Sequence, residues 1–302
     1  MSITENTIYH QDSIAGLAQI DDSSIDLILS DIPYGIGAAD WDVLHANTNS
    51  AFLGSSPAQA RAGDVFKRRG KPINGWSQAD KAMPREYYEW CRSWAPEWNR
   101  VLKPGGSAII FAGRRFAHRC IVAMEDSGFV LRDMLAWERP TAVHRAQRLS
   151  VVFDRRGDTE SAEKWDGWRL GNLRPTFEPV IWCMKPYKQG KTIADNVLAY
   201  GLGAYNEAAF IRAEGEPENI IRSGFGPNER GHHPTQKPLA LMKSLIELVT
   251  TEDHVVLDPF CGSGTTLVAA KLLGRKYVGF EIDDAHYQAA VGRLDELKGG
   301  LF

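Results

Sequence analysis

Short runs of apolar residues alternate along this chain with longer amphipathic stretches. Short apolar runs bounded by turn-forming residues indicate buried strands, and apolar positions spaced three and four apart indicate helices. The pattern predicts strands at residues 25–30, 107–112, 131–138, 179–185, 254–258 and 277–281. It predicts helices at residues 84–102, 115–127, 238–250, 264–273 and 284–297. This alternation predicts an α/β fold, a Rossmann-like, doubly wound and mostly parallel sheet with helices on both faces.

Several segments depart from this alternation. Residues 37–83 are rich in Gly, Ala, Asn and Ser, and residues 140–178 and 186–231 are polar with scattered Trp, Arg and Gly. Long segments without regular structure in a compact domain are usually functional or mobile. Two shorter segments, 102–106 and 271–276, carry a glycine just after a predicted helix, where we expect loops.

Composition narrows the class of protein. The 302 residues, 43% hydrophobic and 24% charged, suit a globular chain with one large core, alone or with an inserted subdomain. No apolar run approaches the roughly 18 residues of a membrane span. The first ten residues also lack the pattern of a signal peptide. We therefore expect a cytoplasmic protein with no membrane partner.

Cysteine spacing and net charge exclude further classes. The four cysteines have no CxxC spacing, so neither a zinc site nor a disulfide framework is predicted, and no metal is expected. A net charge of −3 argues against a chain that coats nucleic acid indiscriminately. Two basic windows, residues 61–71 and 139–156, can serve as local phosphate-binding faces, although an ordinary solvated surface explains them equally well.

A glycine-rich turn near the carboxyl terminus carries the most specific signal. The predicted strand at 254–258 leads into the turn at 260–264, which opens a helix, and the next strand ends in an acid, Glu281. Gly262 and Gly264 allow close approach of backbone to a ligand, and an acid about 20 residues further on can accept hydrogen bonds from a ribose diol. A tight turn without a ligand is the alternative. No Walker phosphate loop is present, so the pattern favours a nucleoside cofactor without phosphate groups.

Three segments resemble the DNA amino-methyltransferases. LDPFCGSGTT at 257–266 resembles their S-adenosylmethionine-binding motif, and SDIPYG at 30–35 resembles their Asp-Pro-Pro-Tyr catalytic motif. HHPTQKPLALMKSLIELVT at 232–250 resembles the segment before the cofactor loop. The catalytic motif precedes the cofactor motif, as in the beta group of the family. The resemblance implies S-adenosylmethionine as cofactor, double-stranded DNA as substrate and a bacterial or phage origin.

The catalytic candidates are Asp31, Ile32, Pro33 and Tyr34. A carboxylate and a backbone carbonyl that accept the two amino hydrogens of a base favour the positive charge that develops on its nitrogen during methylation. Because a base inside a duplex cannot be reached, it must be flipped out, and Tyr34 offers a ring on which it can stack. Ile32 stands where the family has Pro, which we expect to be tolerated because that position supplies its carbonyl. A covalent cytosine-C5 mechanism is excluded, since no cysteine follows a proline.

The resemblance also implies the cofactor site. Its candidate residues are Asp12, Asp31, Thr235, Lys237, Asp258, Phe260, Gly262, Ser263, Gly264, Thr265 and Glu281. Asp12 can equally be the N-cap of a helix, and Ser263 and Thr265 can equally cap the helix that follows the glycine turn. Thr235 and Lys237 are expected near the amino-acid end of the cofactor.

The resemblance divides the chain into two functional parts. Residues 1–139 and 232–302 are expected to form the catalytic domain, with loop 37–83 over the DNA, and residues 140–231 a target-recognition insertion. The candidate DNA-binding residues are Lys67, Arg68, Arg69, Arg145, Arg148, Arg155 and Arg156. A polar surface loop is the alternative for the insertion. Members of this group often form dimers, and Trp90, Trp94 and Trp98 can mark either a dimer face or core packing.

Asp31 favours N6 of adenine as the target, because an initial Asp is usual in adenine enzymes of the family and an initial Ser in N4-cytosine enzymes. The preceding Ser30 keeps cytosine open. Methylation of RNA or of a protein amide, and a catalytically silent DNA-binding module, are the remaining alternatives.

Overall fold

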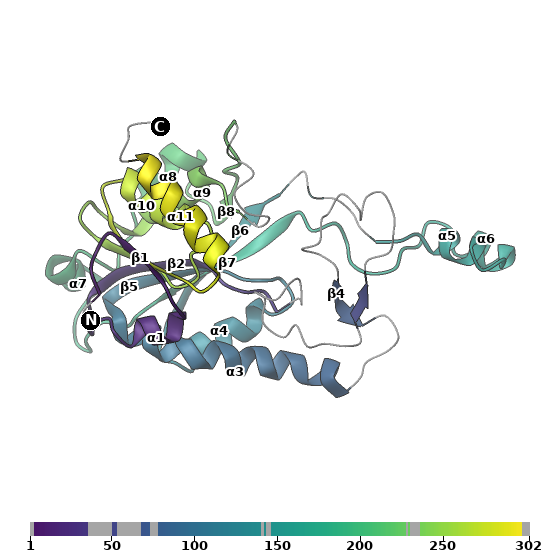
Figure 1. The fold of residues 1–302 in the computed structure, drawn as a ribbon, viewed down its shortest axis with the longest axis horizontal. Helices are drawn as coiled ribbons and strands as arrows, with labels where there is room; N and C mark the ends of the chain where they lie inside the picture. Colours follow the sequence, from purple (N-terminus) through teal and green to yellow (C-terminus); the bar gives the residue numbers. More distant parts are fainter. Residues whose placement is uncertain are drawn as a thin grey trace.

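The computed structural model describes residues 3–35, 50–52, 68–72, 78–139, 142, 146–227, 229 and 236–297. A mixed eight-stranded sheet forms its centre (Figure 1). In spatial order its strands are β1 (Thr7–His10), β10 (Lys276–Glu281), β9 (Val255–Asp258), β2 (Ile25–Asp31), β5 (Leu102–Phe111), β7 (Phe177–Met184), β6 (Val130–Glu138) and β8 (Ile220–Ile221). The first five run parallel, β7 is antiparallel to both of its neighbours, and β8 is parallel to β6. The predicted Rossmann-like α/β fold is confirmed.

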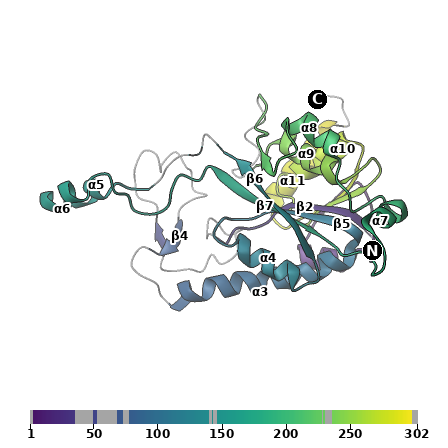
Figure 2. The ribbon, with the colours of Figure 1, turned by 180° about the vertical axis from the view of Figure 1, so that it is seen from behind.

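Helices cover both faces of the sheet (Figures 1 and 2). One face carries α1 (Ser13–Leu17), α3 (Gln78–Val101) and α4 (Ala117–Glu125). The other face carries α8 (Glu207–Glu214), α9 (Leu239–Val249), α10 (Thr265–Leu272) and α11 (Asp284–Glu296). The remaining elements are α5 (Leu149–Asp154), α6 (Thr159–Lys164), α7 (Ile193–Tyr200) and a hairpin of β3 (Ser50–Phe52) and β4 (Arg68–Pro72).

The alternation of side chains along β2 explains the two layers. Ile28 is buried against the α1, α3 and α4 layer, while Leu27 and Leu29 are buried against α9 and α10. Successive side chains of a strand point to opposite faces, so an apolar run produces a strand that is buried on both sides.

Helix α3 begins earlier than the predicted residue 84, and Pro84 lies inside it. A proline inside a helix removes one backbone hydrogen bond. Burial of Asp80 and Met83 on the amino-terminal side of Pro84 accompanies this extension of the helix. Further along the same helix, Trp94 and Trp98 are fully buried in the core. Their spacing therefore reflects core packing, and it gives no support for a dimer interface.

Residues 102–106, which we predicted to be a loop, form the start of β5. Leu102 pairs with Ile25 of β2, and the register of the two strands shifts between Ile25 and Leu27. The irregular pairing accommodates the Pro-Gly-Gly sequence that suggested a turn. The loop predicted at 271–276 is confirmed in part: Gly274 has a φ of +71° just after α10, while β10 already begins at Lys276.

The predicted insertion at 140–231 has two structurally different parts. Its later part contains β7, a strand of the main sheet, together with α7, which packs against β5, and α8, which packs against α9. Residues 146–176, with α5 and α6, project away from the sheet (Figure 1). Within the described ranges, no helix has the length and apolar character needed to cross a membrane.

Candidate active site

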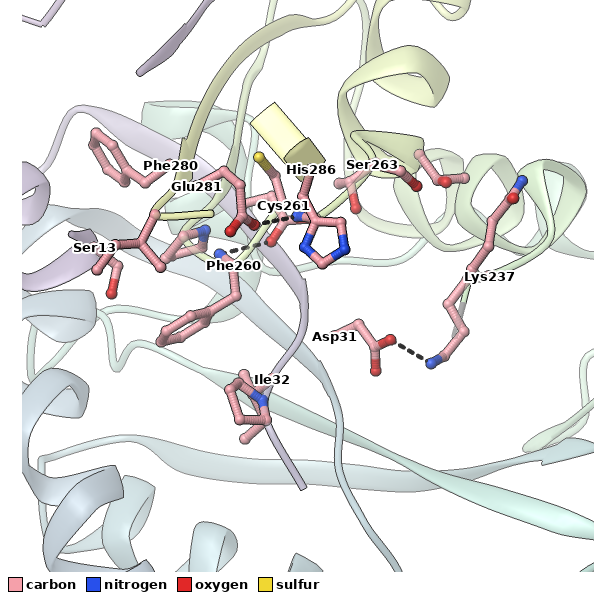
Figure 3. Close-up of a pocket in the computed structure, with 18 of the residues that line it drawn as sticks. Ser13, Asp31, Ile32, Lys237, Phe260, Cys261, Ser263, Phe280, Glu281 and His286 are labelled. Atoms are coloured by element: carbon pink, nitrogen blue, oxygen red, sulfur yellow. Dashed lines mark hydrogen bonds and ion pairs between the residues drawn. The ribbon is translucent and has the colours of Figure 1, made fainter. Parts of the chain in front are cut away.

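Three acids end three neighbouring parallel strands. Asp31 is the last residue of β2, Asp258 of β9 and Glu281 of β10. From β2 and β9, which are adjacent, the chain continues to opposite sides of the sheet, and ligands of α/β proteins bind at the carboxyl ends of strands at such a switch point. A pocket at this edge is lined by all three acids and by Tyr34 and Gly262 (Figure 3). The catalytic and glycine motifs therefore meet at the same rim of one sheet.

Lys237 connects two of the acidic side chains at this edge of the sheet, Asp31 and Glu178. The Lys237 ammonium lies 2.5 Å from Oδ2 of Asp31 (Figure 3). It also lies 3.6 Å from Oε2 of Glu178 and donates to the Tyr34 hydroxyl at 3.1 Å. The Tyr34 hydroxyl lies 2.9 Å from Oδ1 of Asp31 and 3.1 Å from Oε2 of Glu178. Its one hydrogen serves only one carboxylate at a time. Arg139 pairs with the other oxygen of Glu178.

Burial and charge shift the pKa values of Asp31, Tyr34 and Glu178, and not all in the same direction. Burial raises the pKa of Asp31, although the nearby Lys237 ammonium opposes that effect. Burial also raises the pKa of Tyr34 well above its usual range, and the two carboxylates add to the increase. Burial of Glu178 would raise its pKa, but Lys237 and Arg139 outweigh this and hold the pKa below its usual range. The pKa values of the two carboxyl groups therefore shift in opposite directions, towards the protonated form for Asp31 and towards the ionised form for Glu178.

The turn that follows Asp31 is fixed by contacts with the layer of helices α1, α3 and α4. The side chain of Ile32 is buried in the core, and the carbonyl of Pro33 accepts a hydrogen bond of 2.9 Å from the hydroxyl of Tyr87 in α3. The Tyr87 ring is itself fully buried and stacks on Phe116. These contacts fix the turn that presents Asp31 and Tyr34 to the pocket.

Glu281 is bound to the glycine turn itself. One of its carboxylate oxygens accepts from the Gly262 amide at 2.8 Å and the other from the Asp283 amide at 2.8 Å. Each carboxylate oxygen has a second lone pair, so both remain able to accept a hydrogen bond from a ligand. Phe260 forms another wall of the pocket, and its ring packs 5.8 Å from that of Trp90.

Arg293 of α11 holds the glycine turn from behind, a role that the sequence did not indicate. It donates to the Ser263 carbonyl at 2.7 Å, to the Ser263 hydroxyl at 3.3 Å and to the Thr265 hydroxyl at 2.9 Å. Helix α10 has Gly264 as its N-cap and no side-chain capping bond. Ser263 and Thr265 therefore contact a buried arginine and line the pocket, rather than capping the helix.

Asp258 is a buried acid with an unusual pKa. Its Oδ1 accepts from the Ser30 hydroxyl at 2.6 Å and from the Phe260 amide at 3.2 Å. Burial raises its pKa to about 7, against the lowering effect of the hydrogen bonds from Ser30 and Thr266. Ser30 is thus fully buried and bonded to Asp258, and it is absent from the pocket lining.

Asp12 has the capping role that was one of its two predicted alternatives. Its Oδ1 accepts from the amides of Ile14 and Ala15 at 3.0 and 3.1 Å, so it is the N-cap of α1. It also lines the pocket, because β1 pairs with β10 and ends beside Glu281. Asp12 can therefore cap α1 and line the pocket at the same time.

Sequence reasoning missed other side chains at this edge. Glu178 gave no motif signal, since it lies at the start of an ordinary apolar strand. Six further pocket residues were not among the candidates. Gln236, Cys261 and Thr266 lie inside the matched segments, and Gln11, Ser13 and His286 lie within five residues of a candidate. Thr235 lies outside the described residues, whereas Lys237, predicted near the same end of the cofactor, lines the pocket and pairs with Asp31.

The candidate DNA-binding residues lie away from the pocket or outside the described residues. Arg148, Arg155 and Arg156 are exposed and flank α5. Lys67 and Arg145 lie outside the described residues, and only the backbone of Arg68 and Arg69, in β4, is described. The segment that carries α5 joins the end of β6 to the start of β7, and both ends are at the edge of the sheet where β5 and β2 finish. It therefore leaves the sheet on the same side as the pocket.

A family model described as DNA methylase, the N6/N4 methyltransferase family, matches residues 25–292. The chain belongs to this family of DNA methylases. The methylase is 53% identical over 300 residues to the Type II methyltransferase M.HindIII of Haemophilus influenzae, a match that covers 98% of this chain and 97% of the relative. It is 26% identical to the Type II methyltransferase M.HinfI of the same organism, over 97% of this chain and 69% of the relative. These matches make it a Type II DNA methyltransferase of the N6/N4 family, and they confirm the resemblance to DNA amino-methyltransferases.

Solved structures support the fold of the methylase. The PvuII DNA methyltransferase, described as cytosine-N4-specific, superposes with a TM-score of 0.61 at 17% identity and covers 99% of this chain and 92% of its own. The M1.HpyAVI–SAM complex has a TM-score of 0.54 at 23% identity and covers 96% of this chain and 98% of its own.

The pocket of the methylase fits S-adenosylmethionine, the methyl donor of this family. Glu281 can accept hydrogen bonds from a ribose diol, and the partly exposed Phe260 supplies apolar surface for a purine ring. The buried carboxyl group of Asp258 matches a ligand that carries a positive charge. When bound, the cofactor supplies an electrophilic methyl group on sulfur.

Proposed function

We propose that the methylase transfers a methyl group to the exocyclic N6 amine of an adenine that is flipped out of duplex DNA. The observation that carries this proposal is the shared pocket, which is lined by Asp31 and Tyr34 of one motif and by Gly262 and Glu281 of the other. A base held at Asp31 and a cofactor held at the glycine turn would therefore be neighbours, which supplies the orientation that methyl transfer needs.

Asp31 and the Ile32 carbonyl would each accept one hydrogen of the target amine. The amine is a poor nucleophile because its lone pair is delocalised into the ring, and its nitrogen becomes positive as the bond to the methyl group forms. A carboxylate and a carbonyl aimed at that nitrogen favour this change of charge. Tyr34 would stack on the extruded base, and the Pro33–Tyr87 hydrogen bond keeps this turn in place.

The position of Ser30 favours adenine over cytosine. In the sequence Ser30 lies one place before Asp31, too early to replace the acid that initiates the motif. Ser30 is buried and donates to Asp258, so Asp31 is the one of the two that lines the pocket. An acid at this position is the usual pattern of N6-adenine enzymes in the family. N4-cytosine methylation remains the second candidate, since the fold is shared with a cytosine-N4-specific enzyme.

The cofactor would be held by the residues that line the pocket around the glycine turn. Glu281 would bind the ribose, Asp258 the amino group of the methionine end, and Asp12 the adenine end of the pocket. The role of the Gly262 and Gly264 backbone is to permit close approach.

The segment at 146–176 is proposed to contact DNA. Arg148, Arg155 and Arg156 are exposed on it, and it leaves the sheet on the pocket side. Arginines in such positions provide phosphate contacts, which position a duplex without reading its sequence.

The decisive experiment gives the purified protein tritiated S-adenosylmethionine together with duplex DNA, RNA or protein extract. Label in DNA, recovered as N6-methyldeoxyadenosine after digestion to nucleosides, is the expected result. Label recovered as N4-methylcytosine would refute the adenine assignment, and no label in DNA would refute the proposed activity.

Asp31→Ala tests the assigned role of the acid. We expect the transfer rate to fall by about 10²- to 10³-fold, because a group that stabilises developing charge is lost. Cofactor affinity should stay close to that of the unmodified protein, as measured by calorimetry. If Asp31→Ala instead loses cofactor affinity and keeps its transfer rate, Asp31 has a different role.

A further inference from the structure

One ammonium group in the active site lies between two carboxylates. Nζ of Lys237 is 2.5 Å from Asp31 and 3.6 Å from Glu178, and the Tyr34 hydroxyl lies within hydrogen-bond distance of both acids. Asp31 and Glu178 are far apart in sequence and belong to different strands, β2 and β7. The site therefore holds one more carboxylate than the proposed recognition of an amine requires.

The contact between Lys237 and Asp31 opposes the proposed chemistry. Both oxygens of Asp31 are engaged, one by Lys237 and the other by Tyr34. A cation at this distance neutralises the carboxylate, and it would repel the positive charge that develops on the amine during methyl transfer. The ammonium must therefore leave Asp31 when the target base arrives.

The ammonium cannot move to water without a larger rearrangement. The Lys237 side chain is 5% exposed, and its Nζ lies 5.0 Å from the ring centre of Phe111, 5.5 Å from that of Tyr34 and 5.9 Å from that of Trp137. A buried charge without a partner is strongly disfavoured, although aromatic faces provide modest attraction for a cation. Once it leaves Asp31, the Lys237 ammonium therefore needs a second anion nearby.

Glu178 meets this requirement. Its pKa is lowered by Lys237 and Arg139 in spite of its burial, so it is available as an anion. Arg139 holds its far oxygen, which leaves the oxygen that faces Lys237 and Tyr34 in a fixed position. A displacement of about 1 Å would bring Nζ into a normal ionic hydrogen bond with it.

We propose that Glu178 is a positioning residue that takes Lys237, and the Tyr34 hydroxyl with it, from Asp31 as the target amine binds. In this exchange the amine replaces the ammonium at Asp31, and the ammonium keeps an anionic partner throughout. The inference rests on the proposed function, because it requires that Asp31 receives the amine.

Glu178→Gln tests the exchange, because glutamine keeps the size and the hydrogen-bond acceptor but not the charge. With tritiated cofactor and bacterial genomic DNA, kcat should fall by about 10- to 100-fold, while KM for DNA and the Kd of the cofactor stay within about twofold. The matched control is Glu138→Gln, which removes a carboxylate at the end of the neighbouring strand that pairs with Arg222 at 3.6 Å. The control should leave kcat unchanged.

A double-mutant cycle separates positioning from a general structural effect. In a Lys237→Gln background, where no ammonium needs a partner, Glu178→Gln should change kcat by less than about threefold. Additive losses would overturn the proposal, and so would a normal kcat in the single variant or a change confined to KM. If Asp31→Ala loses activity while Glu178→Gln keeps a normal kcat, the exchange is rejected and the proposed function stands.

A structure of the unmodified protein bound to duplex DNA with the base flipped gives a second test that does not depend on folding of a variant. Lys237 should then lie closer to Glu178 than to Asp31. A Lys237 that stays on Asp31 beside the bound base would overturn the proposal.

Discussion

Two glycines of the same turn, Gly262 and Gly264, should respond in opposite ways to the same change, substitution by alanine. Gly264 has a φ of +78°, and an added Cβ would lie 2.8 Å from the Cβ and 3.3 Å from the Cα of Ala290. Ala290 is fully buried in α11, so the two helices would have to move apart. Gly262 has a φ of +51°, but an added Cβ there has no heavy atom within 4 Å, and the residue lines the pocket.

The expected losses follow from these contacts. A side chain in the left-handed region costs roughly 1–2 kcal/mol, and this applies to both positions. Overpacking a core by a methyl group costs typically about 1–3 kcal/mol more, and this applies to Gly264 alone. Gly264→Ala should therefore lower the free energy of unfolding by about 2–5 kcal/mol, or the Tm by roughly 4–10 °C for a chain of this length. Gly262→Ala should lose about 1–2 kcal/mol.

Cofactor binding should show the reverse order. The methyl group of Gly262→Ala would occupy open space in the pocket, so we expect the Kd of S-adenosylmethionine to rise by at least about tenfold. Gly264→Ala should bind within about threefold of the unmodified protein at temperatures where it is folded. Thermal melts and isothermal calorimetry on the same preparations measure both quantities. Equal losses of Tm would refute the packing argument, and unchanged binding in Gly262→Ala would refute close approach of the ligand to this turn.

Two further predictions concern charge. Because the pKa of Asp258 is about 7 in the folded protein and lower when unfolded, its carboxyl group is largely protonated below pH 7 and ionised above it. Affinity for a cofactor with a positively charged amino group should therefore rise up to tenfold per pH unit below about pH 7 and level off above it. Asp258→Asn should remove this dependence, and calorimetry that shows the same slope in the variant would contradict the assignment. Replacing Arg148, Arg155 and Arg156 together by Gln should lower the slope of log Kd for DNA against log salt by about 3, with little change in cofactor affinity; an unchanged slope would show that this segment does not contact phosphates.

Local signals in the sequence predicted most of the sheet and much of the pocket. The strand, glycine turn, helix and terminal acid between residues 254 and 281 lie within one contiguous segment, so each step constrains the next. The same holds for the buried strand β2 and the turn at Asp31 that follows it. These features depend on backbone conformation and side-chain alternation, which neighbouring residues determine.

Boundaries were less predictable where burial outweighs propensity. Helix α3 includes Pro84, and β5 includes a Pro-Gly-Gly sequence, because both segments are held by contacts with distant parts of the chain. The short helices α5 to α8 lie in segments that were predicted to be irregular, since helices of this length have little periodicity to detect.

Only the tertiary structure decided how the charged groups of the site combine. Glu178 comes beside Tyr34 because β7 is antiparallel to β5, and Arg293 contacts the glycine turn because α11 packs behind it. The pairing of Lys237 with Asp31 joins a strand end to a segment more than two hundred residues away. A sequence specifies its motifs through near neighbours, whereas these partners are set by strand register and helix packing, which depend on the whole fold.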